Sequence, residues 1–167
     1  MKNFRLATFD DLAIILEIIK DGQEQLKSQG IDQWQEHAPS SQQFIDDIEK
    51  KYLYVLSEDD AVIGVCALVK EDDPNYTEID GQWLTAGKYS NIHRFAVKKE
   101  FAGQGVGREL MRHCLQENTF PAIRIDTHKD NKAMKKLISH FGFEYCGVIK
   151  LSTGELRDAY ESINTNK

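Results

Sequence analysis

A glycine-rich segment past the middle of the chain constrains the fold more than any other feature of the sequence. Three glycines, Gly103, Gly105 and Gly107, fall within five residues, and the residues before them, 92–97, have the apolar content of a strand. The residues after them repeat apolar side chains at helical spacing, at Val106, Leu110 and Cys114. Glycines let backbone amides approach a ligand closely, and a helix N-terminus adds unpaired N–H groups and a positive dipole end. The segment therefore predicts a site for a phosphate group.

The spacing of these glycines differs from that of two common nucleotide-binding loops. A Walker A loop has a Lys-Ser or Lys-Thr pair directly after its last glycine, and no such pair follows here. A dinucleotide-binding fold has Gly-x-Gly-x-x-Gly near the start of a domain, whereas this sequence has Gly-x-Gly-x-Gly beyond its midpoint. A glycine-rich turn without a ligand, and a nucleotide binder that prefers ATP or NAD, remain open as alternatives.

Length, charge and composition limit the class of protein. A chain of 167 residues is long enough for one domain with a proper core, and we expect residues 1–167 to form a single domain. A net charge of −6 argues against broad nucleic-acid binding and favours a cationic or neutral acceptor. The sequence has no apolar run of membrane-spanning length, and we expect no signal peptide. Three widely spaced cysteines and five histidines without zinc-type spacing predict a cytoplasmic protein with no disulfide framework and no metal site.

The order of predicted elements indicates one α/β domain with a mixed sheet. Capping patterns begin helices at Thr8 and at Ser40 or Ser41. Strands are predicted over 4–8, 52–56, 61–69, 92–97, 122–127, 143–149 and 157–163. Helices are predicted over 12–29, 41–48, from about Val106, and from Asp130 or Asn131 to Phe141. Residues 31–40 and the acidic, then aromatic, residues 71–90 are predicted to be loops, and loops as long as the second are often functional.

Two motifs make a family resemblance specific. Residues 93–97 read HRFAV and lead into FAGQGVG at 101–107; residues 125–128 read IDTH, with Asn131 and a helix ending in FGF behind them. Together with the element order of nearly the whole chain, they resemble the GNAT superfamily of acetyl-CoA-dependent N-acetyltransferases. The resemblance implies a single GNAT-like domain, with a mixed, mostly antiparallel sheet of six to seven strands, splayed central strands and flanking helices.

The resemblance also implies where acetyl-CoA binds. The backbone of Phe95, Ala96 and Val97 would pair with the pantetheine arm as an added strand does. The pyrophosphate would lie against the loop formed by Ala102, Gly103, Gln104, Gly105, Val106, Gly107 and Arg108. The family pattern begins with Arg or Gln, and Ala102 departs from it, but most contacts there are made by backbone amides. Asn131 and Met134 would contact the cofactor arm. The alternatives are that Asn131 only caps its helix, that Met134 is a core residue and that Arg108 is solvated.

Acetyl transfer to an amine needs a general base and a donor to the oxyanion. Some relatives have a glutamate base where this chain has Asn91, which cannot be a base; others have one at the position of Asp126. Asp126 is therefore the first candidate base, acting through water, and His93 is the second. Asp126 could instead form an ion pair with Arg124 or Arg94, and His93 could be a hydrogen-bonded residue under the sheet. A free amide near Phe95–Val97 is the candidate oxyanion donor.

The proton donor to the leaving thiolate is not assigned. Many relatives have a tyrosine seven residues after the asparagine, and Ile138 occupies that position here. His128, Tyr145 and Cys146 are substitutes by proximity along the fold. Cys146 is more simply explained as a buried core thiol, because direct transfer needs no acyl-enzyme.

Aromatic residues in the two long loops are candidates for the acceptor site. Trp34, Trp83 and Tyr89 are assigned to it, with ordinary packing onto the sheet as the alternative. The acidic residues Asp46 and Asp47 are expected on a solvated surface. We expect an acetyl-CoA-dependent N-acetyltransferase acting on a small-molecule or protein amine, with no nucleic-acid or membrane partner. A non-catalytic acyl-CoA-binding module is the alternative, and the fold is compatible with a homodimer through a sheet edge.

Overall fold

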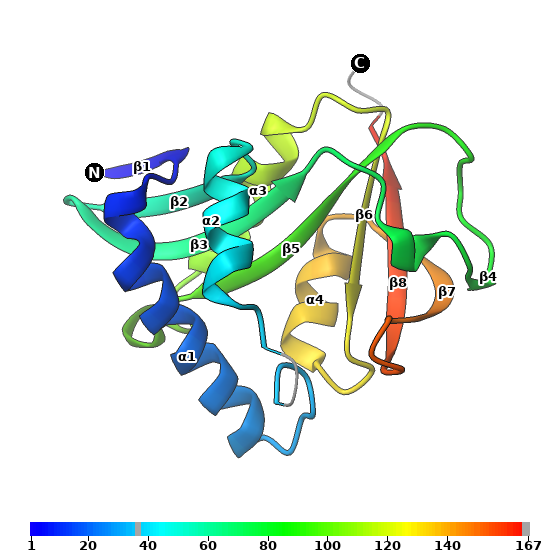
Figure 1. Cartoon of the computed structure of the whole chain (residues 1–167), viewed down its shortest axis with the longest axis horizontal. Helices are drawn as coiled ribbons and strands as arrows, with labels where there is room; N and C mark the ends of the chain where they lie inside the picture. The colour runs from blue at the N-terminus through cyan, green and yellow to red at the C-terminus, as the bar shows by residue number, and fades with distance from the viewer. Residues whose placement is uncertain (36–37, 165–167) are drawn as a thin grey trace. The chain divides into compact units, whose positions relative to one another are not determined.

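The computed structural model describes residues 1–35 and 38–164 of the chain (Figure 1). Residues 36–37 of the predicted early loop and 165–167 at the end of the predicted domain lie outside the described residues. The α-helices are α1 (Leu12–Ser28), α2 (Ser41–Glu49), α3 (Val106–Glu117) and α4 (Lys132–His140), and three short 3-10 turns are η1 (Phe9–Asp11), η2 (Pro74–Tyr76) and η3 (Lys99–Phe101). The strands are β1 (Lys2–Leu6), β2 (Leu53–Glu58), β3 (Ala61–Val69), β4 (Asp80–Gly81), β5 (Tyr89–Val97), β6 (Ala122–Thr127), β7 (Glu144–Lys150) and β8 (Leu156–Ile163).

The strands form one mixed sheet in the order β1-β2-β3-β5-β6-β8-β7-β4, which confirms the α/β class. The four parallel pairs between β5 and β6 end at Ile92 and Ile125, and β5 continues to Val97, as expected for central strands that pair over part of their length. The expected count of six to seven strands is wrong, because the described residues hold eight. The missed strand, β4, has two residues and therefore no alternating pattern in the sequence. It pairs with β7 where Gly81 lies opposite Gly147, at φ values of 141° and 145°, and a Cβ on either would collide with the partner backbone.

The chain divides into two compact units, each described here by itself. The first contains Met1–Val69 and His93–Glu117, and the second contains Lys70–Ile92 and Asn118–Lys167. Strand β5 starts in the second unit and ends in the first.

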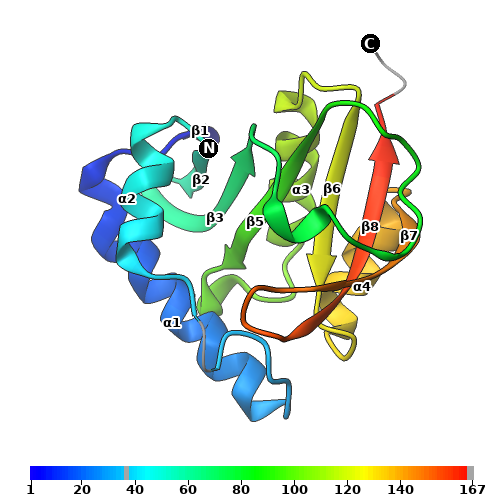
Figure 2. The same ribbon diagram turned by 45° about the vertical axis from the view of Figure 1, so that its right-hand side comes forward.

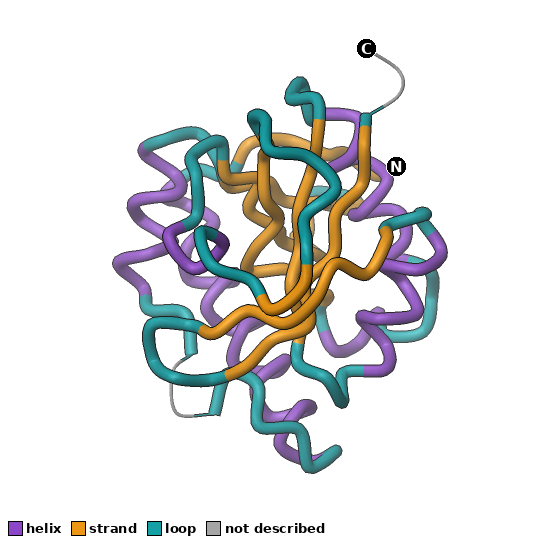
Figure 3. Tube along the Cα trace, turned by 90° about the vertical axis from the view of Figure 1, so that its right-hand side faces the viewer, coloured by secondary structure: helices purple, strands orange, loops and turns teal. Residues whose placement is uncertain are grey.

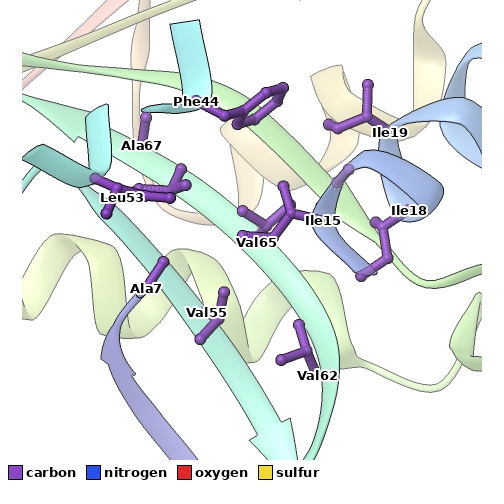
Figure 4. Close-up of a cluster of buried hydrophobic side chains, with 12 residues drawn as sticks. Ala7, Ile15, Ile18, Ile19, Phe44, Leu53, Val55, Val62, Val65 and Ala67 are labelled. Atoms are coloured by element: carbon purple, nitrogen blue, oxygen red, sulfur yellow. The ribbon is translucent and has the colours of Figure 1, made fainter. Parts of the chain in front are cut away.

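In the first unit, α1 and α2 cover one face of the strands and α3 covers the other (Figure 1). The face under α1 and α2 holds the main apolar cluster, in which Ile15 of α1 and Phe44 of α2 pack against Val55 and Val65 (Figure 4). All four side chains are fully buried. The capping patterns are confirmed: Thr8 with Asp11, and Ser40 with Gln43, form capping boxes at the starts of η1 and α2. Residues 12, 15 and 19 then repeat on one face of α1 at the helical period.

The opposite face of the first unit holds α3 close to β3. A Cβ added to Gly64 would lie 3.4 Å from Leu110 and 3.6 Å from Val106, so the missing side chain lets α3 approach the strand. The thiols of Cys66 and Cys114 are buried on this face, and the contact with Cys114 together with burial raises the pKa of Cys66. The glycine loop precedes α3 directly, so this packing fixes the place where the helix begins.

In the second unit, β6 pairs with β8 and β8 pairs with β7 (Figure 2). Figure 3 shows the strands of the chain in orange and its loops in teal. A small apolar cluster joins the long loop to the strands through Tyr76, Tyr89, Ala122, Ile149 and Ala159. The loop of residues 70–88 is therefore held against one face of these strands by its own aromatic side chains.

Candidate functional site

The glycine loop of the first unit presents its backbone to solvent. Gly103 and Gly105 have φ values of 77° and 83°, a left-handed conformation that glycine adopts without steric cost. A Cβ added to either would meet no atom within 4 Å, so both face open space. Ala102, Gln104 and Arg108 are also exposed. The loop is thus accessible along its length, and its shape depends on the two left-handed glycines.

The first turn of α3 completes this surface. The N–H of Glu109 donates to the carbonyl of Gly105 at 3.1 Å, the bond that starts an α-helix at Val106. The amides of Val106, Gly107 and Arg108 therefore belong to the helix end whose donors have no partner within the helix. Val106 itself is only 2% exposed, so it anchors the first turn of the helix. Such an end attracts an anion through both its N–H groups and its dipole.

The end of β5 lies in the same unit as this loop. Ala96 is buried in the apolar cluster, whereas Phe95 and Val97 are half-buried. The N–H of Lys98 donates to the carbonyl of Ile63 at 2.8 Å and fixes the end of the strand against β3. Phe95–Val97 and the predicted pyrophosphate loop thus lie in one unit, whereas Asn131 and Met134, also predicted to contact the cofactor arm, lie in the second.

Arg94 interrupts the regular geometry of β5. Its φ is 51°, in the left-handed region, although it stands inside a strand. In a regular strand Asn91, His93, Phe95 and Val97 would share one face, but the left-handed Arg94 interrupts that alternation.

The structure corrects the expectation for Asp47. It is 6% exposed rather than solvated, and it accepts two hydrogen bonds from Arg94: Nε to Oδ2 at 2.5 Å and Nη2 to Oδ1 at 3.1 Å. Burial raises the pKa of Asp47, and Arg94 opposes that rise. A charge on His93 would also lower it, which places His93 in the electrostatic environment of the pair. A signal was present in the sequence, because Asp47 shares a helix face with Phe44 and Ile48, both buried.

Asp126, the first candidate base, lies in the second unit and is held by Tyr76. The Tyr76 hydroxyl donates to Oδ2 of Asp126 at 2.6 Å. Tyr76 is 2% exposed, and burial followed by the nearby carboxylate raises its pKa well above the usual value, so the phenol keeps its proton. The two arginines considered as partners have other carboxylates: Arg124 pairs with Glu161 and Arg94 with Asp47. The sequence pointed to Tyr76 only as an aromatic residue of the long loop.

Trp83 and Tyr89 are brought together around Arg124. The guanidinium carbon lies 4.0 Å from the centroid of the Trp83 ring and 3.9 Å from that of Tyr89. Arg124 Nε donates to Glu161 at 2.8 Å, and Glu161 in turn accepts the N–H of Leu84 at 2.7 Å. This buried network ties the long loop to β6 and β8. The packing alternative is thus observed for both aromatic residues, and a role in acceptor binding stays a prediction.

The remaining predicted residues have local partners. Trp34 belongs to the first unit, has a φ of 67° and packs against the apolar cluster there. Asn131 caps α4, its Oδ1 accepting the N–H of Met134 at 3.2 Å; this does not test a role of either residue in cofactor binding. Ile138 is fully buried, and burial raises the pKa of Cys146, which is 7% exposed, as expected for a core thiol. No proton donor emerges from these contacts.

Two features are absent from the described residues. No group of three or more His, Cys, Asp or Glu side chains among them is arranged to hold a metal ion. In residues 1–35 and 38–164, no helix combines the length and the apolar character needed to cross a membrane.

Comparisons with known proteins agree on one family. The model of the acetyltransferase (GNAT) family matches residues 17–143. The uncharacterized N-acetyltransferase YesJ of Bacillus subtilis is 28% identical over 149 residues, which cover 84% of this chain and 81% of the relative. The crystal structure of a GNAT-family acetyltransferase from Streptococcus agalactiae is 29% identical, with a TM-score of 0.90 over 98% of this chain and 95% of the other. A putative acetyltransferase from Salmonella typhimurium, solved with its cofactor acetyl-CoA, is 15% identical and shares the fold, with a TM-score of 0.68 over 98% and 94% of the two chains.

Proposed function

Because the chain belongs to the acetyltransferase (GNAT) family, we propose that it is a cytoplasmic enzyme that transfers an acetyl group from acetyl-CoA to a primary amine of a small molecule or protein. The amine attacks the thioester directly while both substrates are bound. The observation that carries the proposal is the exposed glycine loop at the start of α3, with left-handed Gly103 and Gly105.

The loop has the features needed to bind a pyrophosphate. Its amides and the first amides of α3 supply several donors to one anion, and the helix dipole adds a partial positive charge. Ala102 offers no polar side chain, so in this chain the backbone carries the binding. Arg108 is exposed and in position on the first turn of α3 to neutralise phosphate charge. The name of the Bacillus relative and the acetyl-CoA bound by the Salmonella protein support acetyl-CoA as the acetyl donor.

The chemistry forms a C–N bond and breaks a C–S bond. A lysine-like amine has a pKa of about 10.4, so at pH 7 its neutral form costs about 4.6 kcal/mol, which a base must offset. We assign the proton from the amine to Asp126 through water, with His93 as the second candidate. An amide within Phe95–Val97 would stabilise the oxyanion. The CoA thiolate then leaves and takes up a proton.

A ligand panel tests the binding step. Thermal unfolding of the purified protein is measured in parallel with acetyl-CoA, CoA, ATP and NAD. A ligand present at about 100 times its dissociation constant stabilises the folded state by about 2.7 kcal/mol, which raises the Tm by several degrees. A rise with acetyl-CoA and CoA alone supports the proposal. No rise with either at millimolar concentration, or a larger rise with ATP or NAD, contradicts it.

A further inference from the structure

Arg94 has a left-handed backbone conformation, which is energetically unfavourable for arginine. Among the described residues, five other than glycine have a positive φ, and four of them, Trp34, Lys51, Asp59 and Asp60, lie in turns. Arg94 lies within β5. A side chain in this region costs about 1–2 kcal/mol relative to the usual conformations, because Cβ approaches the following carbonyl. Some contact must therefore hold the backbone there.

The contact is the buried ion pair with Asp47. Two hydrogen bonds, at 2.5 Å and 3.1 Å, join the planar guanidinium to both carboxylate oxygens and so fix its orientation as well as its distance. The side chains of Arg94 and Asp47 are 15% and 9% exposed, which limits screening by water. Asp47 is itself rigid, since α2 is anchored by Phe44 and Ile48 and the carbonyl of Asp47 accepts the N–H of Tyr52 at 2.9 Å.

The left-handed residue sets the direction of the backbone that follows it. In a strand, side chains alternate between faces and N–H groups between edges, so a shift of one residue reverses both. With Arg94 left-handed, Ala96 enters the apolar cluster while Phe95 and Val97 stay half-buried. A regular strand through Arg94 would exchange these orientations and turn the N–H groups of Phe95–Val97 to opposite edges.

We propose that Arg94 and Asp47 are positioning residues of the transferase: their ion pair holds the left-handed backbone at Arg94, which aims the amides of Phe95–Val97 at the acetyl-pantetheine arm. The inference rests on the proposed function and adds to it two residues that act through the backbone of β5. It explains why a charged pair is buried between α2 and β5, where apolar side chains would pack at a lower desolvation cost.

Two double variants that differ by one methyl group test this proposal. Asp47→Asn with Arg94→Gly removes both charges but leaves a residue that is left-handed without cost; Asp47→Asn with Arg94→Ala removes the same charges and adds a Cβ. Acetyl-CoA affinity is measured by calorimetry, folding by circular dichroism, and KM and kcat by thiol release. We expect the glycine form to bind acetyl-CoA about tenfold more tightly than the alanine form, with a matching difference in KM.

Different outcomes would overturn the positioning role of Arg94 and Asp47 and the proposed transferase function. Equal acetyl-CoA affinity of the two folded double variants overturns the inference, whether both are tight or both are weak, because only the backbone distinguishes them. Failure of the unmodified protein to bind acetyl-CoA overturns the proposed function itself. Should the alanine form not fold, Arg94→Lys provides a second test: it keeps the charge but loses the two-point contact, and we expect about threefold weaker binding. Unchanged affinity in that variant would equally overturn the inference.

Discussion

Replacing Gly105 by alanine tests whether the glycine loop binds the pyrophosphate of acetyl-CoA. Gly105 has a φ of 83°, and the added Cβ would project into space that no protein atom occupies within 4 Å. The substitution therefore has two effects: strain in the backbone, and a methyl group where the loop faces solvent. Gly30 is a matched control in the same unit, with a φ of 74° and equally open surroundings, at the C-terminus of α1.

The two substitutions should cost the same stability. Alanine in the left-handed region costs about 1–2 kcal/mol in either place, which lowers the Tm of a domain of this size by about 2–8 °C. Their effects on acetyl-CoA should differ. Losing one charge-assisted hydrogen bond to the pyrophosphate costs about 1.5–3 kcal/mol, or about 10- to 100-fold in affinity, and only Gly105→Ala would cause it.

Calorimetric titration of acetyl-CoA into the three proteins measures this directly, with thermal unfolding alongside. We expect similar losses of Tm in both variants, at least tenfold weaker binding in Gly105→Ala, and affinity within about twofold of the original protein in Gly30→Ala. Equal affinity of the two variants would refute the assignment of the pyrophosphate to this loop.

Three further predictions concern the catalytic pair, the pH dependence of stability and the core. Tyr76→Phe removes the donor that stabilises the Asp126 carboxylate, so the acid limb of the kcat/KM profile should move up by about 1–2 pH units; an unmoved limb would exclude Asp126 as the base. The Arg5 guanidinium lowers the pKa of Asp11, so the stability from this pair is present above the unfolded pKa of about 4 and is lost as the pH falls through the lower folded value. The Tm difference between the original protein and Asp11→Asn should therefore shrink from pH 7 to pH 3, and a constant difference would contradict the coupling. Phe44→Ala empties a fully buried position and should cost about 3–5 kcal/mol in denaturant unfolding, with a loss below about 1 kcal/mol arguing against this core.

The sequence predicted best what depends on neighbours along the chain. Helices α1 to α4 and the hairpin of β2 and β3 lie where apolar period and capping residues placed them. The glycine loop before α3 was also predicted, whereas the left-handed conformation of Gly103 and Gly105 was not part of that prediction. By contrast, β4 could not be predicted, because a strand of two residues shows no alternation of apolar and polar side chains. Its pairing depends on the close approach of two glycines.

Contacts between residues far apart in the chain could not be predicted from the sequence. Asp47 and Arg94 are 47 residues apart, and Tyr76 and Asp126 are 50 apart. Asp47 was expected to be solvated although it shares a helix face with Phe44 and Ile48, because the sequence does not show that Arg94 lies opposite that face. The left-handed Arg94 was equally hidden, because arginine has no preference for that conformation and adopts it here through a partner on another element.

Turnover is the most direct test of acetyl transfer from acetyl-CoA to an amine by this protein. Release of the CoA thiol from acetyl-CoA is followed with a panel of small primary amines and lysine- or N-terminus-bearing peptides, and acetylation of the acceptor is read by mass spectrometry. We expect thiol release that depends on the amine, with one acetylated amine formed for each thiol. Tight binding of acetyl-CoA without amine-dependent release for any acceptor, at any pH where the protein is folded, would contradict it and would identify an acyl-CoA-binding module instead.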